Sequence, residues 1–214
     1  QGLQNHHKAI DFFESALEIE STNIAAMNNL ANSLKNTGQY LKADKLFQKI
    51  IKISPSYIQA YNNYANLKDL VNDVEGSIKL YNQALLIAKE KKISPIVILS
   101  HLAGAYHSLN KKKESIEIVN EILKNDPLNA EAHKALSSLI KYSKKNEETM
   151  IHISRMKNIL NGNNLEDNQK GIISFALGKA YDDLNDADTA IKFLSSGNKI
   201  IQKIRGSNIN KDIN

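Results

Sequence analysis

Histidine has the broadest chemistry of any side chain in this sequence, because it can bind a metal or transfer a proton near neutral pH. The 214 residues include six histidines and no cysteine, which excludes a thiolate zinc site, a disulfide framework and a cysteine nucleophile. His101 and His107 are six positions apart and would point in different directions from a helix. His6 and His7 are adjacent, which suits an exposed helix start better than a ligand pair. We therefore expect no metal site and no catalytic histidine.

The other residue types that commonly carry catalysis also lack the required arrangement. The 9 glycines are scattered singly and form no phosphate-binding loop. Adjacent carboxylates, such as Asp182 with Asp183 and Glu147 with Glu148, fall at expected helix ends or turns, where solvated charge is typical. No serine has a base partner that the sequence reveals. The sequence therefore predicts that this chain is not an enzyme and uses no cofactor.

The charge of the chain is basic but diffuse. Lysine and arginine number 28 against 23 acidic residues, which gives a net charge of +5. The basic runs at 91–92, 111–113 and 144–145 lie beside expected helix junctions, without the aromatic residues that stack on bases. No apolar run approaches the roughly 18 residues of a membrane helix. We therefore expect no nucleic-acid partner, no membrane partner and a cytoplasmic location.

Asparagine shows the one polar pattern that exceeds what folding requires. Three asparagines recur with the same spacing in two successive stretches of the chain, although asparagine is a mediocre helix former. The two sets are Asn28, Asn29 and Asn32, and Asn62, Asn63 and Asn66. Each amide offers donors and an acceptor, which suits a clamp on the backbone of an extended peptide. His101 and His107 could continue this surface in the next unit, and duplication within an asparagine-rich sequence stays open as the alternative explanation.

A repeat organises the chain and must position these residues. When the sequence is aligned with itself, Ala31, Ala65 and Ala103 take the same place in three successive units. Within each unit, apolar or small residues recur at three- and four-residue steps in two successive segments, which predicts two amphipathic helices. A polar turn separates them, where Gly38 can adopt a left-handed cap, and Pro55 ends the second helix.

The repeated pattern resembles that of a tetratricopeptide-repeat array. Between Met27 and Pro55 the chain presents the family's succession of a large residue, Leu-Ala, alanine, phenylalanine and proline. The same order is recognisable at 58–84 and 96–127, degraded at 130–161 and clear again at 171–197. The resemblance implies an all-α fold, a right-handed α-α superhelix of tandem helix pairs whose first helices line the concave surface.

The register also implies the boundaries of the units. One repeat domain covers 1–205, and a polar tail or the start of a linker covers 206–214. The expected units are a half repeat at 1–21 and full repeats at about 24–57, 58–94, 96–129, 130–163 and 171–204. Extra residues around 85–95 lengthen a helix or its loop, and further extra residues precede the last unit. The opening helix lacks a partner before it and would expose one face.

Two kinds of groove are known in this family. The asparagine pattern is similar to the asparagine ladder in the repeat superhelix of O-linked N-acetylglucosamine transferase. Chaperone-binding members instead grip a terminal carboxylate with basic residues and asparagine. Asn32 and Asn63 match their asparagines, but Asn28 replaces a lysine, and Val97 and His101 replace the later basic pair. The resemblance therefore implies a groove for a protein or an extended peptide rather than a chaperone-tail clamp.

The C-terminal unit carries a second resemblance. Residues 175–200 are similar to the last repeat of bacterial proteins that fuse tetratricopeptide repeats to a sulfotransferase domain. We expect the chain to be a protein-interaction scaffold. The alternative is a substrate-presenting region whose sulfotransferase domain lies beyond Asn214, and a purely structural spacer is a third interpretation. The identity of the partner and the oligomeric state stay open.

Overall fold

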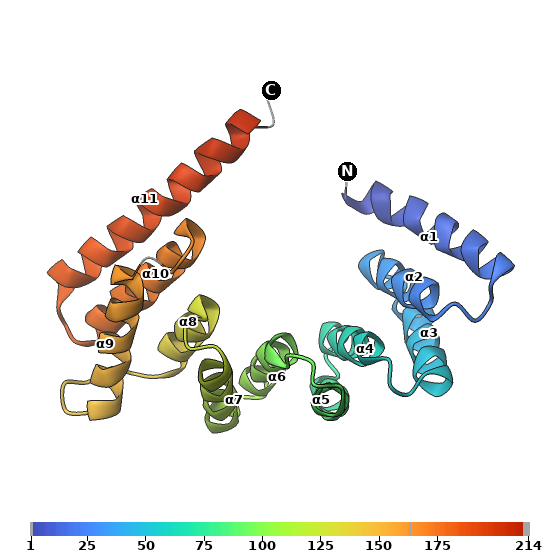
Figure 1. The fold of residues 1–214 in the computed structure, drawn as a ribbon, viewed down its shortest axis with the longest axis horizontal. Helices are drawn as coiled ribbons and strands as arrows, with labels where there is room; N and C mark the ends of the chain where they lie inside the picture. The colour runs from blue at the N-terminus through green and yellow to red at the C-terminus, as the bar shows by residue number, and fades with distance from the viewer. Residues whose placement is uncertain (1, 163, 212–214) are drawn as a thin grey trace. The chain divides into compact units, whose positions relative to one another are not determined.

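A computed structural model describes residues 2–162 and 164–211 of the chain. Within these ranges the chain is all-α, with eleven helices and no strand (Figure 1). The all-α repeat of helix pairs that the sequence predicts is therefore confirmed. The chain divides into two compact units, unit 1 at Gln1–Ser115 and unit 2 at Ile116–Asn214.

Unit 1 contains one opening helix followed by helix pairs. Its helices are α1 (Gly2–Ile19), α2 (Ile24–Asn36), α3 (Tyr40–Ile53), α4 (Ile58–Leu70), α5 (Val74–Lys91) and α6 (Ile96–Ser108). The boundary between the units falls within the next helix, α7 (Lys112–Asn125). Unit 2 continues with α8 (Ala130–Leu139), α9 (Glu147–Asn161), α10 (Asp167–Asp183) and α11 (Ala187–Lys211). We call α2, α4, α6, α8 and α10 the first helices of their pairs.

The core of unit 1 is formed by the apolar stripes seen in the sequence. Met27 and Leu34 of α2 are buried in one cluster with Phe47 and Ile50 of α3. Each such side chain contributes about 1.5–3 kcal/mol when it is removed from water. Ala43 is fully buried in the same cluster, where a longer side chain would hold the two helices apart. Side chains of α1 and α4 complete the cluster, so no helix pair buries its apolar face alone.

Local signals set the ends of these helices. The Asn23 side chain accepts a hydrogen bond from the Ala26 N–H and begins α2. Gly38 follows α2 with a φ of +78°, a conformation that glycine adopts without steric cost. α3 ends at Ile53, two residues before Pro55. The left-handed glycine and the proline stop are both confirmed.

The extra residues around 85–95 lengthen a helix. α5 has 18 residues against 14 in α3 and is followed by Lys92, whose φ of 54° is left-handed. At the other end of the chain, α11 continues to Lys211, whereas the sequence analysis expects a polar tail or linker from residue 206. Because no proline lies between residues 201 and 211, nothing in the sequence forces the helix to stop earlier.

Unit 2 departs from the repeat at α8. This helix has 10 residues, whereas α2, α4 and α6 have 13 each. Ile140 has extended backbone angles of −106° and 156°, and residues 140–146 form no helix before α9 begins. Tyr142 from this segment is only 1% exposed and joins the core of unit 2 with Met156 and Leu177. The degraded repeat is thus a helix pair whose first helix has lost its last turn.

Candidate functional site

The first helices of unit 1 carry the asparagines that the sequence singles out. Asn28 of α2 is buried, and its Oδ1 accepts a hydrogen bond of 3.1 Å from Asn63 Nδ2 of α4. One unit further along, Asn62 Oδ1 of α4 lies 3.0 Å from His101 Nδ1 of α6. The two bonds join corresponding places of successive units, because His101 occupies the position of Asn63 in the next repeat. Four of the expected groove residues therefore link neighbouring first helices to one another.

Asn66 is also used within the protein. The hydroxyl of Tyr81, on α5, lies 2.5 Å from Asn66 Oδ1 and 2.8 Å from Asp69 Oδ2. Tyr81 is fully buried, and burial together with the carboxylate of Asp69 raises the pKa of its hydroxyl. Among the described residues, Asp69 Oδ1 is the one buried side-chain polar atom without a hydrogen-bond partner. This cluster fixes α4 against α5 rather than facing a ligand.

Three of the expected groove residues keep their polar groups free. Asn29 and His107 are exposed, Asn32 is half-buried, and no side chain of the three has a hydrogen bond to another described residue. Gly104 of α6 stands at the place of Asn32 and Asn66, and a Cβ added there would meet no atom within 4 Å. The first-helix surface is the side of α2 that carries Asn29 and Asn32, the side of α6 that carries Gly104 and His107, and the corresponding side of α4 at Asn66.

The electrostatics near this surface are mild. Burial lowers the pKa of the Lys35 ammonium group on α2. Burial also lowers the pKa of His101, with Asp69 opposing the effect and Lys35 reinforcing it. His101 is therefore neutral at pH 7, and the surface has no concentrated charge of one sign. Its amides offer neutral donors and acceptors, the groups that pair with a peptide backbone.

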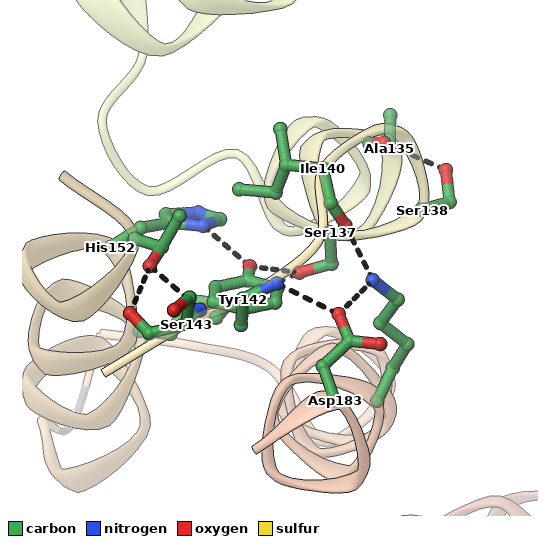
Figure 2. A network of polar contacts seen from close by, with 11 residues as sticks. Ala135, Ser137, Ser138, Ile140, Tyr142, Ser143, His152 and Asp183 are labelled. Atoms are coloured by element: carbon green, nitrogen blue, oxygen red, sulfur yellow. Dashed lines mark hydrogen bonds and ion pairs between the residues drawn. The ribbon is translucent and has the colours of Figure 1, made fainter. Parts of the chain in front are cut away.

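Unit 2 contains a buried polar network that the sequence analysis missed. His133 of α8 is fully buried, and its Nε2 lies 3.0 Å from the Pro127 carbonyl oxygen. Its Nδ1 lies 2.9 Å from His152 Nε2 on α9, and His152 Nδ1 lies 2.7 Å from the Tyr142 hydroxyl. The Ser137 hydroxyl completes the chain, 2.7 Å from the same tyrosine oxygen. Figure 2 shows the Tyr142 hydroxyl between His152 and Ser137.

The Pro127 carbonyl oxygen, at one end of this network, determines which atoms carry the protons. Because a carbonyl oxygen can only accept, His133 donates to Pro127 through Nε2 and accepts at Nδ1 from His152 Nε2–H. His152 Nδ1 then accepts from the Tyr142 hydroxyl, whose oxygen accepts from Ser137. Both histidines are neutral in this arrangement. Burial is the largest cause that lowers the pKa of His152 to about 4, and burial raises the pKa of Tyr142 to about 12.

The segment between α8 and α9 is held by α10. The Tyr142 N–H donates a 2.9 Å hydrogen bond to Asp183 Oδ2, as Figure 2 shows. The Lys179 ammonium group donates to the same carboxylate oxygen and to the Ile140 carbonyl, each at 2.5 Å. The Thr149 hydroxyl donates to the Ser143 carbonyl at 3.1 Å. The irregular backbone is thus satisfied by defined partners.

The described part of the chain has neither a cluster of metal ligands nor a membrane-spanning helix. No group of three or more histidine, cysteine or acidic residues there could hold a metal ion. No helix there combines the length and apolar character needed to cross a membrane.

Helix pairs that follow one another in register define an all-α helical-repeat fold. Residues 12–45 match the family model for the tetratricopeptide repeat. Over 48 residues, which are 22% of this chain and 28% of the relative, the sequence is 40% identical to the uncharacterized protein ycf37 of Porphyra purpurea. The chain therefore spans well under half of that relative's length.

Solved structures share the fold at low sequence identity. YrrB, described as a TPR protein with an unusual peptide-binding site, has a TM-score of 0.61 at 14% identity, over 88% of this chain and 91% of its own. BtubC from P. vanneervenii has a TM-score of 0.69 at 15% identity, over 95% and 91% of the two chains. MamA has a TM-score of 0.54 at 13% identity, over 95% and 92%. At these identities the likeness supports the fold of a tetratricopeptide array.

Proposed function

We propose that this chain is a protein-interaction scaffold that binds an extended segment of a partner protein on the first-helix surface of unit 1. The main observation behind the proposal is that some asparagines bond to neighbouring helices while others leave their amides unpaired. Asn28, Asn62 and Asn63 are used between helices, while the amides of Asn29 and Asn32 stay without a partner among the described residues. Unpaired amides at one register of a helix face suit main-chain groups of a peptide.

Further support comes from the fold and from the absence of steric obstruction at Gly104. Structures with this fold include one described as having a peptide-binding site, although at 14% identity the likeness extends to fold alone. A peptide backbone can approach α6 closely at Gly104, because no side chain projects from this residue. The mild electrostatics favour a segment recognised through its backbone over one recognised through charge.

The test uses peptides selected from a random phage-displayed library against the whole chain. Replacing Asn29 and Asn32 with alanine removes two neutral hydrogen bonds, each worth about 0.5–1.5 kcal/mol, so affinity should fall roughly 5- to 150-fold. Asn82→Ala is the matched control, because Asn82 is an exposed asparagine on the second helix α5. Fluorescence anisotropy measures the affinities, and the unfolding midpoint checks that folding is unchanged.

Amide hydrogen exchange locates the bound peptide independently. The proposal expects slower exchange on α2, α4 and α6 when the peptide is bound. Protection confined to α3 and α5, or an equal loss of affinity in Asn82→Ala, would contradict the proposal. The repeated asparagines would then reflect only the asparagine-rich composition of the chain.

We also infer that the proposed scaffold has no catalytic activity and no nucleic-acid or membrane partner. The described residues present neither a glycine-rich strand-to-helix turn, nor clustered aromatic residues beside the basic runs, nor a helix able to cross a membrane. A cytoplasmic location remains a proposal, and fluorescence imaging of the tagged protein in its own cell tests it.

A second candidate function rests on residues 175–200, which resemble the last repeat of bacterial tetratricopeptide–sulfotransferase proteins. In that case the repeats would present an acceptor polypeptide to a catalytic domain beyond Asn214. Sequencing the gene past Asn214 tests this directly. A 3′-phosphoadenosine nucleotide titrated into this chain by calorimetry should show no saturable micromolar binding, because no phosphate-binding turn occurs in the described residues.

A further inference from the structure

A pocket of about 510 Å³ lies on unit 2. One wall is the irregular segment 141–145 between α8 and α9, and the other is the turn 183–185 between α10 and α11. The two walls are joined by the hydrogen bond from the Tyr142 N–H to Asp183. The pocket is therefore held in shape by contacts already formed in the free protein.

The pocket itself arises from the way in which successive helix pairs stack. A second pocket, of about 340 Å³, lies on unit 1 between residues 72–75 and residues 108–109. Both pockets occupy the same place in the repeat, between the turn after one first helix and the turn after the next. The existence of the larger pocket is therefore no sign of function, and only the residues that line it can indicate a ligand.

The two linings have opposite charge. The pocket on unit 1 is lined by the carboxylates Asp73 and Glu75 and by no lysine or arginine. The pocket on unit 2 is lined by Lys141, Lys144 and Lys145. Since stacking creates both hollows, the positive lining is specific to the degraded repeat and does not follow from the fold.

Two lysines of the unit 2 pocket interact electrostatically with nearby carboxylates, Lys141 with Asp183 and Lys144 with Asp186. All three lysines of the lining are exposed, and none forms an ion pair with another described residue. The single carboxylate in the lining, Asp183, is already paired with Lys179 and accepts the Tyr142 N–H. The pocket thus has an excess of positive charge beside a fixed backbone, because its lining holds three lysines and one carboxylate. Leu184, half-buried in the same wall, adds an apolar contact.

We propose that this pocket binds a short acidic peptide segment, in which one or two carboxylates pair with Lys141, Lys144 and Lys145 and a neighbouring apolar side chain contacts Leu184. A nucleic acid fits the pocket less well. Tyr142, the one aromatic residue in the lining, is only 1% exposed and cannot stack on a base.

The test measures binding of a fluorescein-labelled peptide, Ser-Glu-Asp-Leu-Glu-Ser, to the whole chain at an ionic strength of about 0.15 M, where charges more than about 8 Å apart are largely screened. The amide peptide Ser-Gln-Asn-Leu-Gln-Ser and a thymidine decanucleotide are the comparison probes. Lys141→Glu combined with Lys144→Glu reverses the pocket charge. Lys112→Glu combined with Lys113→Glu is the matched control, because it changes net charge equally at exposed lysines outside the pocket.

The proposal expects the acidic peptide to shift the amide resonances of residues 141–145 and 183–185. The pocket variant should weaken this binding by about tenfold, and the control variant by much less, because exposed ion pairs act mainly at short range. The amide peptide should not bind. Asn29→Ala with Asn32→Ala should leave the affinity unchanged, which separates this site from the first-helix surface.

Three results would overturn the proposal. The first is no binding of the acidic peptide up to millimolar concentration. The second is an equal loss in the pocket and control variants, which would mean that only net charge matters. The third is a decanucleotide that binds more tightly at the same resonances, which would make the pocket a nucleic-acid site.

Discussion

Acidification should weaken unit 2 through its buried histidines. His152 has an ordinary pKa of 6.5, and in the folded protein burial, together with His133 and Arg155, lowers this pKa to about 4. A proton on His152 Nδ1 would face the Tyr142 hydroxyl that now donates to it, so the hydrogen-bonded chain would have to reverse. The added charge would also lie in a core with no carboxylate bonded to the ring.

The sign and size of the effect follow from proton linkage. Because the folded state binds the proton more weakly than the unfolded state, stability is full above pH 6.5 and is lost as pH falls toward 4. From His152 alone, the unfolding free energy should drop by about 2 kcal/mol between pH 7.5 and pH 5, and by about 3.4 kcal/mol once the pH is well below 4. Burial lowers the pKa of His133 as well, so its contribution has the same sign.

Urea unfolding at pH 7.5, 6 and 5 measures this loss by circular dichroism, and amide resonances of α9 and α10 report unit 2 separately from unit 1. His152→Gln should be less stable at pH 7.5 but should show a flatter pH dependence, because the titrating group is gone. His107→Gln is the control, since His107 is exposed. A loss below about 0.5 kcal/mol in the natural sequence, or an unchanged slope in His152→Gln, would refute the reasoning.

Three further substitutions test the packing, each measured as a change in the urea unfolding midpoint. Leu102→Ala should cost about 2–5 kcal/mol, because Leu102 is 1% exposed and a cavity would remain; a neutral result would contradict the repeat register. Gly178→Ala should cost about 1–3 kcal/mol, because the new Cβ would lie 2.6 Å from the Leu194 side chain and 3.4 Å from the Ala190 carbonyl oxygen; an unchanged midpoint would contradict this overpacking. Gly104→Ala, in a similar helical setting with nothing within 4 Å, should instead stabilise the protein by up to about 1 kcal/mol.

The sequence predicts the fold well where local rules and the repeat agree. Leu102 is placed in the core by its register, Gly38 at a left-handed turn by its residue type, and Pro55 beyond a helix end by its missing N–H. The extra residues around 85–95 could be assigned to either a helix or a loop, because alanine, leucine and lysine suit the former and give no stop before Pro95. The structure assigns them to α5.

The asparagines are predictable as a group but not individually. Periodicity puts Asn28, Asn29 and Asn32 on polar positions of one helix, yet it does not say which amide meets a neighbouring helix. That depends on the distance between first helices, which brings Asn63 Nδ2 within 3.1 Å of Asn28 Oδ1 and leaves Asn29 exposed. A bond between residues so far apart in the sequence has no local signature.

The buried histidines, by contrast, do leave a signal in the register. The place that Met27 takes in its unit is held by Tyr61, Leu99 and then His133 in the units that follow, so a histidine stands where the three preceding units have a large core residue. In the same alignment, the place of Leu46 is held by Leu80, Ile118 and then His152.

A buried imidazole requires hydrogen-bond partners, since an unpaired polar group in the core costs about 1–3 kcal/mol. His133 obtains them from Pro127 and His152, and His152 obtains its second partner from Tyr142. Tyr142 follows the shortened α8, in the segment 140–146 that forms no helix and supplies one wall of the lysine-lined pocket. The weak match of this repeat to the family pattern and its lysine-lined pocket therefore coincide with the replacement of two apolar residues by the buried histidines His133 and His152.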